Sequence, residues 1–524
     1  MNKLKDFRLL LLFIIITTAF TGLYAQFAGG SGTSEDPYQV ATAEHLNNIR
    51  NYLDSHFIQI ADIDLDVAPF NQDGGWVPIG FYSTVVDTPN IVFTGSYNGD
   101  DNIIQNLMIN GTVLTGAAGL FGYADHAIFR NIQVSNCNVS GAYMAAGLLG
   151  YGTNDSLYNC HASGIVSNEI VSSDDGATGG LIAKCDLTSI NNCSSNCVIS
   201  SNRFNTGGLA GYANHSTMYD CYSSGSLVGG GHTGGLVGQC HYLDVIDCFS
   251  TADITATLSN TGGLMGWGAR SNIDRCYVTG NVNGNTDVGG LCGHLDLCYV
   301  TNCFARGAVS GTIRVGGLVG RQCIITYITN SYATGIVTGT GTENIGGMVG
   351  ETSTPYLTTN CYWDMQTSGQ TTSASGEGRT TLQMTYPYNP DTYVEWDFEN
   401  IWANDIDGTL NDGYPIFGYM IPVANEDDVI PAVPSVTMSN YPNPFRYNTS
   451  INFNLPKSGQ VSLSIYNSKG QLVRTLTESN CSKGEHLLTW DGKTDTNQQC
   501  ANGIYLYRLQ GTGFSLTRKL LLSK

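Results

Sequence analysis

A Gly-Leu step, written once as Gly-Met, recurs nine times across the middle of the chain, and few folds accommodate such a repeat. Its glycines are Gly119, Gly147, Gly180, Gly208, Gly235, Gly263, Gly290, Gly317 and Gly347, separated by 28, 33, 28, 27, 28, 27, 27 and 30 residues. A near-constant period of this length is typical of a solenoid or a similar array. The chain of 524 residues is also too long for one ordinary compact core.

Each repeat has the composition of strands joined by tight turns. Gly, Ser, Thr, Asn, Val and Ile dominate, and a unit is too short for a well-packed pair of helices. A coil of about 27 residues holds three short strands. The sequence therefore predicts an all-β fold: a right-handed parallel β-helix solenoid with an N-terminal cap, followed by a small Ig-like antiparallel β-sandwich.

A cysteine that follows most key glycines by 13 or 14 residues defines the register of the coils. A small residue or Val usually lies two positions after it, and an aliphatic residue usually lies six positions after it. Even-numbered offsets share one face of a strand, so this face is predicted to be the interior. The resulting inward ladder consists of Cys160, Cys193, Cys221, Cys248, Cys276, Cys303 and Cys361, with Ser331 in the remaining unit.

Three states are open to these stacked cysteines. Coils about 4.8 Å apart are close enough for disulfides, but parallel Cβ vectors suit that bond poorly. Metal binding would call for a CxxC pair or a histidine cluster, and neither accompanies the ladder. Because buried cysteine is a good small hydrophobe, we favour a ladder of packed thiols. A polar residue precedes each rung, which predicts a turn bonded to neighbouring backbone.

The residue after each rung points outward by the same parity, and six of eight are aromatic. These six form a predicted aromatic stripe, and the remaining two positions hold His161 and Ser194. One interpretation is stacking between coils that stiffens the wall, and we favour it. The other is a flat platform for glycan rings or a partner protein. The stripe consists of Tyr222, Phe249, Tyr277, Phe304, Tyr332 and Tyr362.

These phrases resemble the GLUG-motif repeat family, which combines a Gly-Leu-x-Gly step with an Asn-Cys-Tyr-like step. "GGLVGQC…IDCFSTA" and "GGLVGRQC…TNSYATG" carry the resemblance, which extends over roughly residues 30–420. It implies a cap and first coils over 26–118, repeat coils over 119–361 and a closing segment over 362–420. In the cap, Thr42 is a predicted helix N-cap, and Leu46, Ile49 and Leu53 share one helical face.

The charge of the chain changes sign near residue 440. Residues 27–439 carry 38 acidic and 10 basic residues, whereas residues 440–524 carry 4 acidic and 10 basic ones. The acidic body argues against nucleic acid as a partner. A Pro- and acid-bearing linker over 421–438 and strand-like runs after it predict a separate β-sandwich over 439–524.

This last region resembles the type A C-terminal sorting domain of type IX secretion and the related flagellar hook-capping Ig-like module. "YPNPF", "SIYNSKGQLVRTL", "GIYLYRL" and the tail "TRKLLLSK" carry the resemblance. It implies that residues 439–524 engage the type IX secretion machinery and that the protein is released or displayed on the outer surface. Cys481 and Cys500 flank a predicted hairpin, and a disulfide between them is left open.

The N-terminus has the features of a secretory signal. Lys3, Lys5 and Arg8 precede a hydrophobic stretch of 12 residues, and "GLYAQ" offers a cleavage site after Ala25. We therefore predict a signal peptide over residues 1–25. No later stretch has the length and apolarity of a transmembrane helix, so the predicted location is secreted or outer-surface.

Catalytic motifs are scarce. HExxH and GxSxG are absent, and "NTD" at 285–287 lacks the other residues of a pectinase-type site. Asp62, Asp64 and Asp66 alternate on one strand and could hold Ca²⁺, although a solvated strand face explains them as well; no other cofactor is expected. We predict a non-catalytic, adhesin-like protein that binds a glycan or a host or matrix protein. A polysaccharide lyase or hydrolase on the same scaffold is the alternative.

Overall fold

The structure is a computed structural model of the whole chain. It describes residues 26–83, 88–110, 116–141, 143–168, 176–341, 343–354, 356–421, 437–441, 445–446, 448–455, 458–467, 471–511 and 514–522. The chain divides into two compact units, residues 1–421 and 422–524. The predicted signal peptide lies outside the described residues, as does most of the predicted linker.

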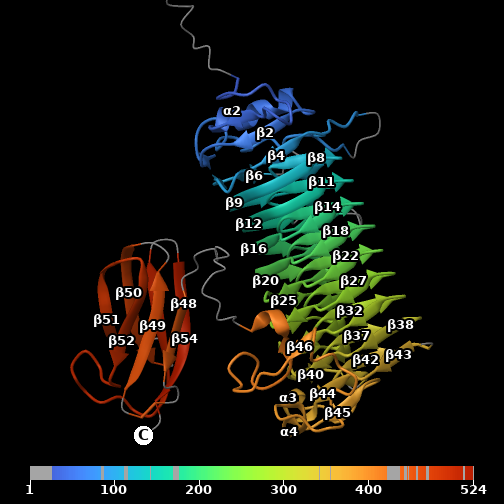
Figure 1. Cartoon of the computed structure of the whole chain (residues 1–524), viewed down its shortest axis with the longest axis vertical. Helices are drawn as coiled ribbons and strands as arrows, with labels where there is room; N and C mark the ends of the chain where they lie inside the picture. The colour runs from blue at the N-terminus through green and yellow to red at the C-terminus, as the bar shows by residue number, and fades with distance from the viewer. Residues whose placement is uncertain are drawn as a thin grey trace, which may run out of the picture. The chain divides into compact units, whose positions relative to one another are not determined.

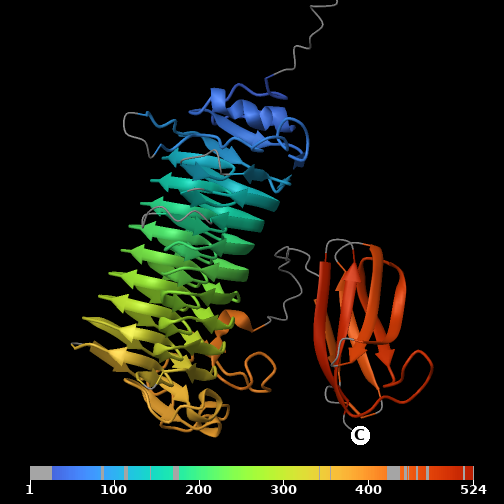
Figure 2. The same ribbon diagram turned by 180° about the vertical axis from the view of Figure 1, so that it is seen from behind.

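The first unit is a parallel β-solenoid whose coils each contribute one strand to each of two sheets (Figures 1 and 2). Within the described residues each of these sheets has nine strands, all parallel and in register. The first contains β7 (Ala117–Ala118), β10 (Met144–Ala145), β13 (Ala177–Gly179), β17 (Thr206–Gly207), β21 (Thr233–Gly234), β26 (Ser259–Gly262), β31 (Thr286–Gly289), β36 (Ile313–Gly316) and β41 (Ile345–Gly346). The second contains β8 (Phe121–Asp125), β11 (Leu149–Thr153), β14 (Ile182–Asp186), β18 (Ala210–Asn214), β22 (Val237–His241), β27 (Met265–Ala269), β32 (Cys292–Asp296), β37 (Val319–Gln322) and β42 (Val349–Thr352).

The rest of each coil forms a larger parallel sheet, which has 27 strands among the described residues. Its N-terminal part holds β1 (Tyr38–Val40), β2 (His56–Gln59), β3 (Ile63–Asp64), β4 (Ser96–Asn98), β5 (Ile103–Gln105), β6 (Met108–Asn110), β9 (Ile128–Ser140), β12 (Ser156–Asn168), β15 (Ser189–Asn191), β16 (Ser194–Ser201), β19 (Thr217–Tyr219), β20 (Tyr222–Gly229), β23 (Asp244–Ile246), β24 (Phe249–Ser250) and β25 (Asp253–Ala256). It continues with β28 (Asn272–Asp274), β29 (Tyr277–Val278), β30 (Val282–Asn283), β33 (Tyr299–Thr301), β34 (Phe304–Ala305), β35 (Val309–Gly311), β38 (Thr326–Thr329), β39 (Tyr332–Ala333), β40 (Val337–Gly339), β43 (Tyr356–Thr359), β44 (Tyr362–Asp364) and β45 (Glu377–Arg379).

A short helix follows the first strand, β1, at the N-terminal end of the solenoid. Helix α2 (Ala43–Asn48) runs into a 3-10 turn, η1 (Ile49–Asn51). As predicted, the side chain of Thr42 caps the helix by accepting a hydrogen bond from the His45 backbone N–H at 3.2 Å. Leu46 and Ile49 are fully buried against the core, and Leu53 is partly buried there. The helix packs its apolar face on the core at the end where the coils begin.

Seven of the nine key glycines, those from Gly147 to Gly317, allow two close approaches at once. A Cβ on Gly208 would lie 1.8 Å from the Gly235 carbonyl oxygen of the next coil and 2.8 Å from the Ser223 Cβ across the interior. The residue two positions after each of the first seven rungs, from Cys160 to Ser331, is small or Val and faces one of these glycines. The facing residues are Ala162, Ser195, Ser223, Ser250, Val278, Ala305 and Ala333. At the last rung Trp363 takes this place and faces Gly347.

The cysteine rungs are buried, and each thiol bonds to backbone. The Cys248 thiol donates to the Ile246 carbonyl at 3.2 Å, and the Cys221 backbone N–H of the preceding coil donates to the same sulfur at 3.3 Å. Ser331 reproduces the pattern, since its hydroxyl donates to Thr329 and accepts from the Cys303 N–H. None of the sixteen cysteines forms a disulfide in the structure, and the seven of the ladder are buried.

The coils turn at three corners, and each corner holds a residue in the left-handed region. In one coil these are Leu187, Asn192 and Asn205, with φ of 53°, 50° and 62°. Asn and Asp tolerate this conformation better than other non-glycine residues do. The polar turn was predicted to bond to neighbouring backbone. In the structure its Asn side chains instead form hydrogen bonds with one another between coils. Asn192 donates to Asn159 at 3.2 Å.

A closing segment follows the last coil and contains α3 (Met365–Ser368), α4 (Thr381–Met384), β46 (Trp402–Ala403), β47 (Ile416–Phe417) and the 3-10 turn η3 (Gly418–Met420). The second unit has two antiparallel sheets around its own buried core. One holds β48 (Thr437–Tyr441), β49 (Thr449–Leu455) and β52 (Gly484–Trp490), and the other holds β50 (Gly459–Asn467), β51 (Leu472–Cys481), β53 (Gly503–Gly511) and β54 (Phe514–Leu522).

Replacing one key glycine tests the packing of the coils. In Gly235→Ala the new Cβ would lie 2.0 Å from the Gly263 carbonyl oxygen and 2.9 Å from the Ser250 Cβ. We expect a loss of about 3 kcal/mol in unfolding free energy, seen as a lower Tm, because backbone cannot move aside cheaply. Gly74→Ala is the control, since its Cβ would meet nothing nearer than 3.9 Å. Equal Tm values for the two variants would contradict this account.

Candidate functional site

The aromatic stripe is a continuous stack of rings on the outside of the coils. Neighbouring rings from Tyr222 to Tyr332 lie 4.8–5.1 Å apart with planes inclined by only 3–12°. Rings this close and this parallel turn much of their faces toward one another. The stripe therefore presents mainly ring edges to its surroundings, which favours the stacking interpretation over a flat platform.

The closing segment covers half of this stripe, which corrects the expectation of six exposed rings. Phe304, Tyr332 and Tyr362 are 1%, 0% and 3% exposed. Their cover is a cluster that includes Met384, Tyr393, Trp396, Trp402, Tyr414 and Phe417. A phenol hydroxyl fixes the cover in place, because Tyr332 donates to the Pro415 carbonyl at 2.8 Å. Tyr277 is half-buried at the edge of this cover, with its ring 6.2 Å from that of Phe417. Beyond it lie the half-buried Phe249 and Tyr222, which is 36% exposed.

A second row of outward side chains runs along the sheet from β8 to β42, and the sequence analysis missed it. Each member lies four residues after a key glycine, is paired in register with the next, and is half-buried. We call this row the β8–β42 ladder. It consists of Tyr123, Tyr151, Lys184, Tyr212, Gln239, Trp267, His294, Arg321 and Glu351.

The first half of the ladder combines rings with one cation and one acid. Tyr123 and Tyr151 are stacked at 5.2 Å. The Lys184 ammonium lies between two rings, 5.1 Å from the centre of Tyr151 and 5.4 Å from that of Tyr212. Asp186 accepts a 2.8 Å hydrogen bond from the Tyr151 hydroxyl. These groups offer apolar surface and hydrogen-bonding atoms side by side.

The middle of the ladder surrounds an indole with histidines. The ring of Trp267 lies 5.3 Å from His232 and 5.1 Å from His241. Its Nε1–H donates to the Asp296 carboxylate at 3.1 Å. Burial lowers the pKa of His232 and of His241, so both imidazoles remain neutral further into the acidic range. Around Trp267 the two histidines therefore contribute neutral polar rings and no positive charge.

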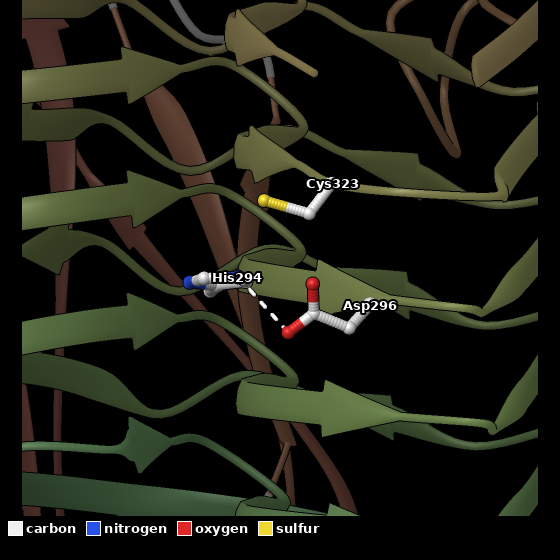
Figure 3. A group of neighbouring side chains, drawn as sticks. All are labelled: His294, Asp296 and Cys323. Carbon is white, nitrogen blue, oxygen red and sulfur yellow. Dashed lines mark ion pairs between the residues drawn. The ribbon is translucent and has the colours of Figure 1, made fainter. Parts of the chain in front are cut away.

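His294 lies at the centre of a mixed cluster of charged and sulfur side chains (Figure 3). Its Nε2 is 3.2 Å from Asp296 Oδ2, and its Nδ1 is 3.6 Å from Asp287 Oδ2. Cys323 belongs to the same group, in which one ligand atom from each of His294, Asp296 and Cys323 lies within 4.8 Å of the others. Burial lowers the pKa of His294, but its two carboxylate partners outweigh burial and raise it to about 11.

The three carboxylates predicted for calcium are exposed but are not brought together. Ile63 and Leu65 point inward, as expected. The group of potential metal ligands found among the described residues does not include Asp62, Asp64 or Asp66. Each instead accepts hydrogen bonds from a different neighbour: Asp62 from the Ile103 N–H, Asp64 from Gln105, Asn106 and the Asp66 N–H, and Asp66 from Asn71.

No disulfide joins Cys481 and Cys500 in the structure, so the bond that the sequence left open is not formed. Both contribute to the core of the second unit, Cys500 as a buried residue and Cys481 as a partly buried one.

Two cavities of the first unit lie near its N-terminal end. One, of about 350 Å³, is lined by residues that include Arg50, Val77 and Phe81, and the other, of about 470 Å³, by residues that include Phe70, Asp73 and Trp76. Among the residues that line the two cavities, Asp73 is the only one with a carboxylate. Neither cavity therefore offers the pair of acids that a glycosidase needs. Among the helices that the structure describes, none has the length and apolar composition to cross a bilayer.

One buried acid lies near the start of the β8–β42 ladder. Asp155 is 3% exposed, and its Oδ1 accepts the Ala127 N–H at 2.8 Å. Its Oδ2 has no hydrogen-bond partner among the described residues. Burial raises its pKa to about 8. Other coils place a hydroxyl here, such as Ser216, which accepts the Thr188 N–H.

The family of FlgD Ig-like domains matches residues 446–513, within the second unit. A "Putative Gly-rich membrane protein" of Evansella cellulosilytica is 34% identical over 173 residues, which are 30% of this chain and 19% of that protein. Halomucin of Haloquadratum walsbyi is 30% identical over 155 residues, which are 29% of this chain and 2% of that protein. The chain thus spans less than a fifth of either relative.

Among solved structures, dimeric latent PorU from Porphyromonas gingivalis is 17% identical in sequence, with a TM-score of 0.16. The match covers 21% of this chain and 10% of the PorU chain. This similarity is too slight to support an inference. The chain is a parallel β-solenoid followed by a unit of two antiparallel sheets, in which residues 446–513 match the family of FlgD Ig-like domains.

Asp155→Asn tests the buried acid. Because the folded pKa is raised above the ordinary value of 3.8 to about 8, the wild type holds its full stability below about pH 4 and loses some as pH rises toward 8. The loss is on the order of a few kcal/mol, at about 1.4 kcal/mol per pKa unit. We expect the variant to match the wild type in Tm at pH 4 and to exceed it at pH 9. Asp54→Asn, at an exposed position, is the control, and parallel pH profiles of Tm for all three proteins would contradict the interpretation.

Proposed function

We propose that this chain is a secreted or cell-surface binding protein of the adhesin-like, non-catalytic kind, and that the β8–β42 ladder is its ligand-binding face. The observation that carries the proposal is the composition of the ladder: partly exposed rings lie in register with amide, imidazole, ammonium and carboxylate groups. Rings supply apolar area and polar atoms fix orientation, which is the combination that small-ligand and glycan sites use.

An extended polymer suits this face better than a compact ligand does. One side chain recurs per coil, about every 4.8 Å, so contacts repeat along the solenoid axis. Lys184, placed between Tyr151 and Tyr212, is the only lysine between Asp6 and Lys457. A cation held against rings and a nearby Asp186 favour a glycan that carries both hydroxyl and acidic groups. The names of the two relatives, a Gly-rich membrane protein and a halomucin, are compatible with a surface role.

Export would depend on the second unit. The FlgD-type match over residues 446–513 and the resemblance of residues 439–524 to type A sorting domains support type IX secretion as the route. In this proposal the domain engages the secretion machinery and the solenoid is the cargo that is displayed or released.

A glycan array probed with residues 26–421 and with ladder variants tests the binding face. We expect the wild type to bind at least one polysaccharide class and Tyr212→Ala/Trp267→Ala to lose about tenfold or more in affinity, which is 1.4 kcal/mol per factor of ten. The control is Tyr222→Ser/Phe249→Ser in the aromatic stripe, which should lower Tm and leave binding unchanged. Binding that survives the ladder variant, or vanishes only in the stripe variant, would place the ligand elsewhere.

Removing residues 439–524 tests the route of export. In a host with type IX secretion, we expect the truncated chain to stop in the periplasm, while a periplasmic carrier fused to residues 422–524 reaches the surface or the medium. Cell fractionation and immunoblotting measure both. Export of the truncated chain at the wild-type level would overturn this part of the proposal and leave the binding face untouched.

A further inference from the structure

The cluster around His294 has the composition of a metal site, and it involves two adjacent coils. His294 and Asp296 belong to β32, and Cys323 directly follows β37, the neighbouring strand. The Cys323 N–H donates to the Leu295 carbonyl at 2.9 Å, which holds the thiol beside Asp296. Figure 3 shows the three side chains arranged around one space. From this arrangement we infer that His294, Asp296 and Cys323 bind a divalent transition-metal ion of the Zn²⁺ class.

The histidine is oriented for this role. Its Nε2 forms an ion pair with Asp296 Oδ2 at 3.2 Å, a contact that a bound ion would replace with a bond to each of the two groups. Its Nδ1 faces the Asp287 carboxylate at 3.6 Å, and Asp287 is in turn paired with Arg314. A carboxylate behind a histidine fixes the ring and leaves the far nitrogen for the metal. Nε2 is therefore the nitrogen that would bind.

The other two ligands are also supported. The Trp267 Nε1–H bonds to Asp296 Oδ2 at 3.1 Å and orients that carboxylate. Arg314 pairs with Asp287, and Arg321 pairs with Glu351 at 3.1 Å, so His294 is the cation that faces Asp296. His294 would release its proton when the ion binds. The Asp296 carboxylate and the Cys323 thiolate would then supply the negative charge that a divalent ion requires.

The ligand set selects the metal. Thiolate and imidazole favour Zn²⁺ and its neighbours, whereas Ca²⁺ and Mg²⁺ take oxygen ligands. Three atoms within 4.8 Å of one another need only small side-chain rotations to reach bond lengths of about 2.0–2.3 Å. The side chain of Asp296 is 31% exposed, so solvent reaches the site and a water can complete the coordination. A bound ion would join two coils and stabilise the folded state.

Co²⁺ and Zn²⁺ added to the chelator-treated full chain test the inference. We expect one equivalent of Co²⁺ to give a thiolate-to-cobalt charge-transfer absorption, and Zn²⁺ to displace it and raise Tm. In Cys323→Ser the absorption and the Tm increase should both disappear, while Tm without metal stays near the wild-type value. Asp296→Asn should weaken Zn²⁺ binding at least tenfold.

Cys303→Ser is the matched control, because Ser331 occupies the same rung in the next coil and shows that serine fits there. This variant should bind Co²⁺ as the wild type does. Absence of a charge-transfer band in the wild type, or a band that persists in Cys323→Ser, would overturn the assignment. If Cys323→Ser lowers Tm even without metal, His294→Gln serves as the second variant. Loss of the charge-transfer band in His294→Gln, with the band intact in Cys303→Ser, would then support the assignment, and persistence of the band in His294→Gln would overturn it.

Discussion

The close approach of successive backbones at the key glycines is the constraint on which the rest of the solenoid depends. At Gly208 even one methyl group would overlap the carbonyl of the next coil and the small residue across the interior. The glycine is the position that must stay small; the residue opposite it is Ala, Ser or Val along the repeat and Trp363 only at the last coil. This contact, repeated once per coil, sets the register and so decides which side chains point inward and which point outward.

The cysteine ladder follows from the same geometry. A sulfur that bonds to a carbonyl two residues earlier and accepts the N–H of the preceding coil satisfies backbone groups at a turn. Serine does this equally well at position 331, but cysteine also fills apolar space. The thiols thus have a structural explanation that needs neither disulfides nor metal. Cys323 differs, because it belongs to another position of the coil and lies beside His294.

Much of the fold could be predicted because parity within a strand is strict and the repeat supplies many examples of it. The inward rungs and the outward stripe both follow from alternation alone. The cover over Tyr332 could not be predicted, since it depends on Pro415 and Trp396, which lie outside the repeat and share no period with it. The β8–β42 ladder could have been predicted from the repeat, because its members are the residues four positions after each key glycine. The residues six positions after Gly290 and Gly317 are Asp296 and Cys323, so the same count places these two in neighbouring coils.

The division between inner and outer positions also explains where function would concentrate. Inner positions are confined to small or apolar residues by the spacing of the coils, whereas outer positions of the β8–β42 ladder change from tyrosine to lysine, tryptophan, histidine and arginine along the axis. The backbone contributes a fixed spacing, and each coil contributes one variable side chain to the face. A solenoid of this kind can therefore hold a rigid row of chemically different groups, of which the cluster at His294 has the most varied ligand chemistry.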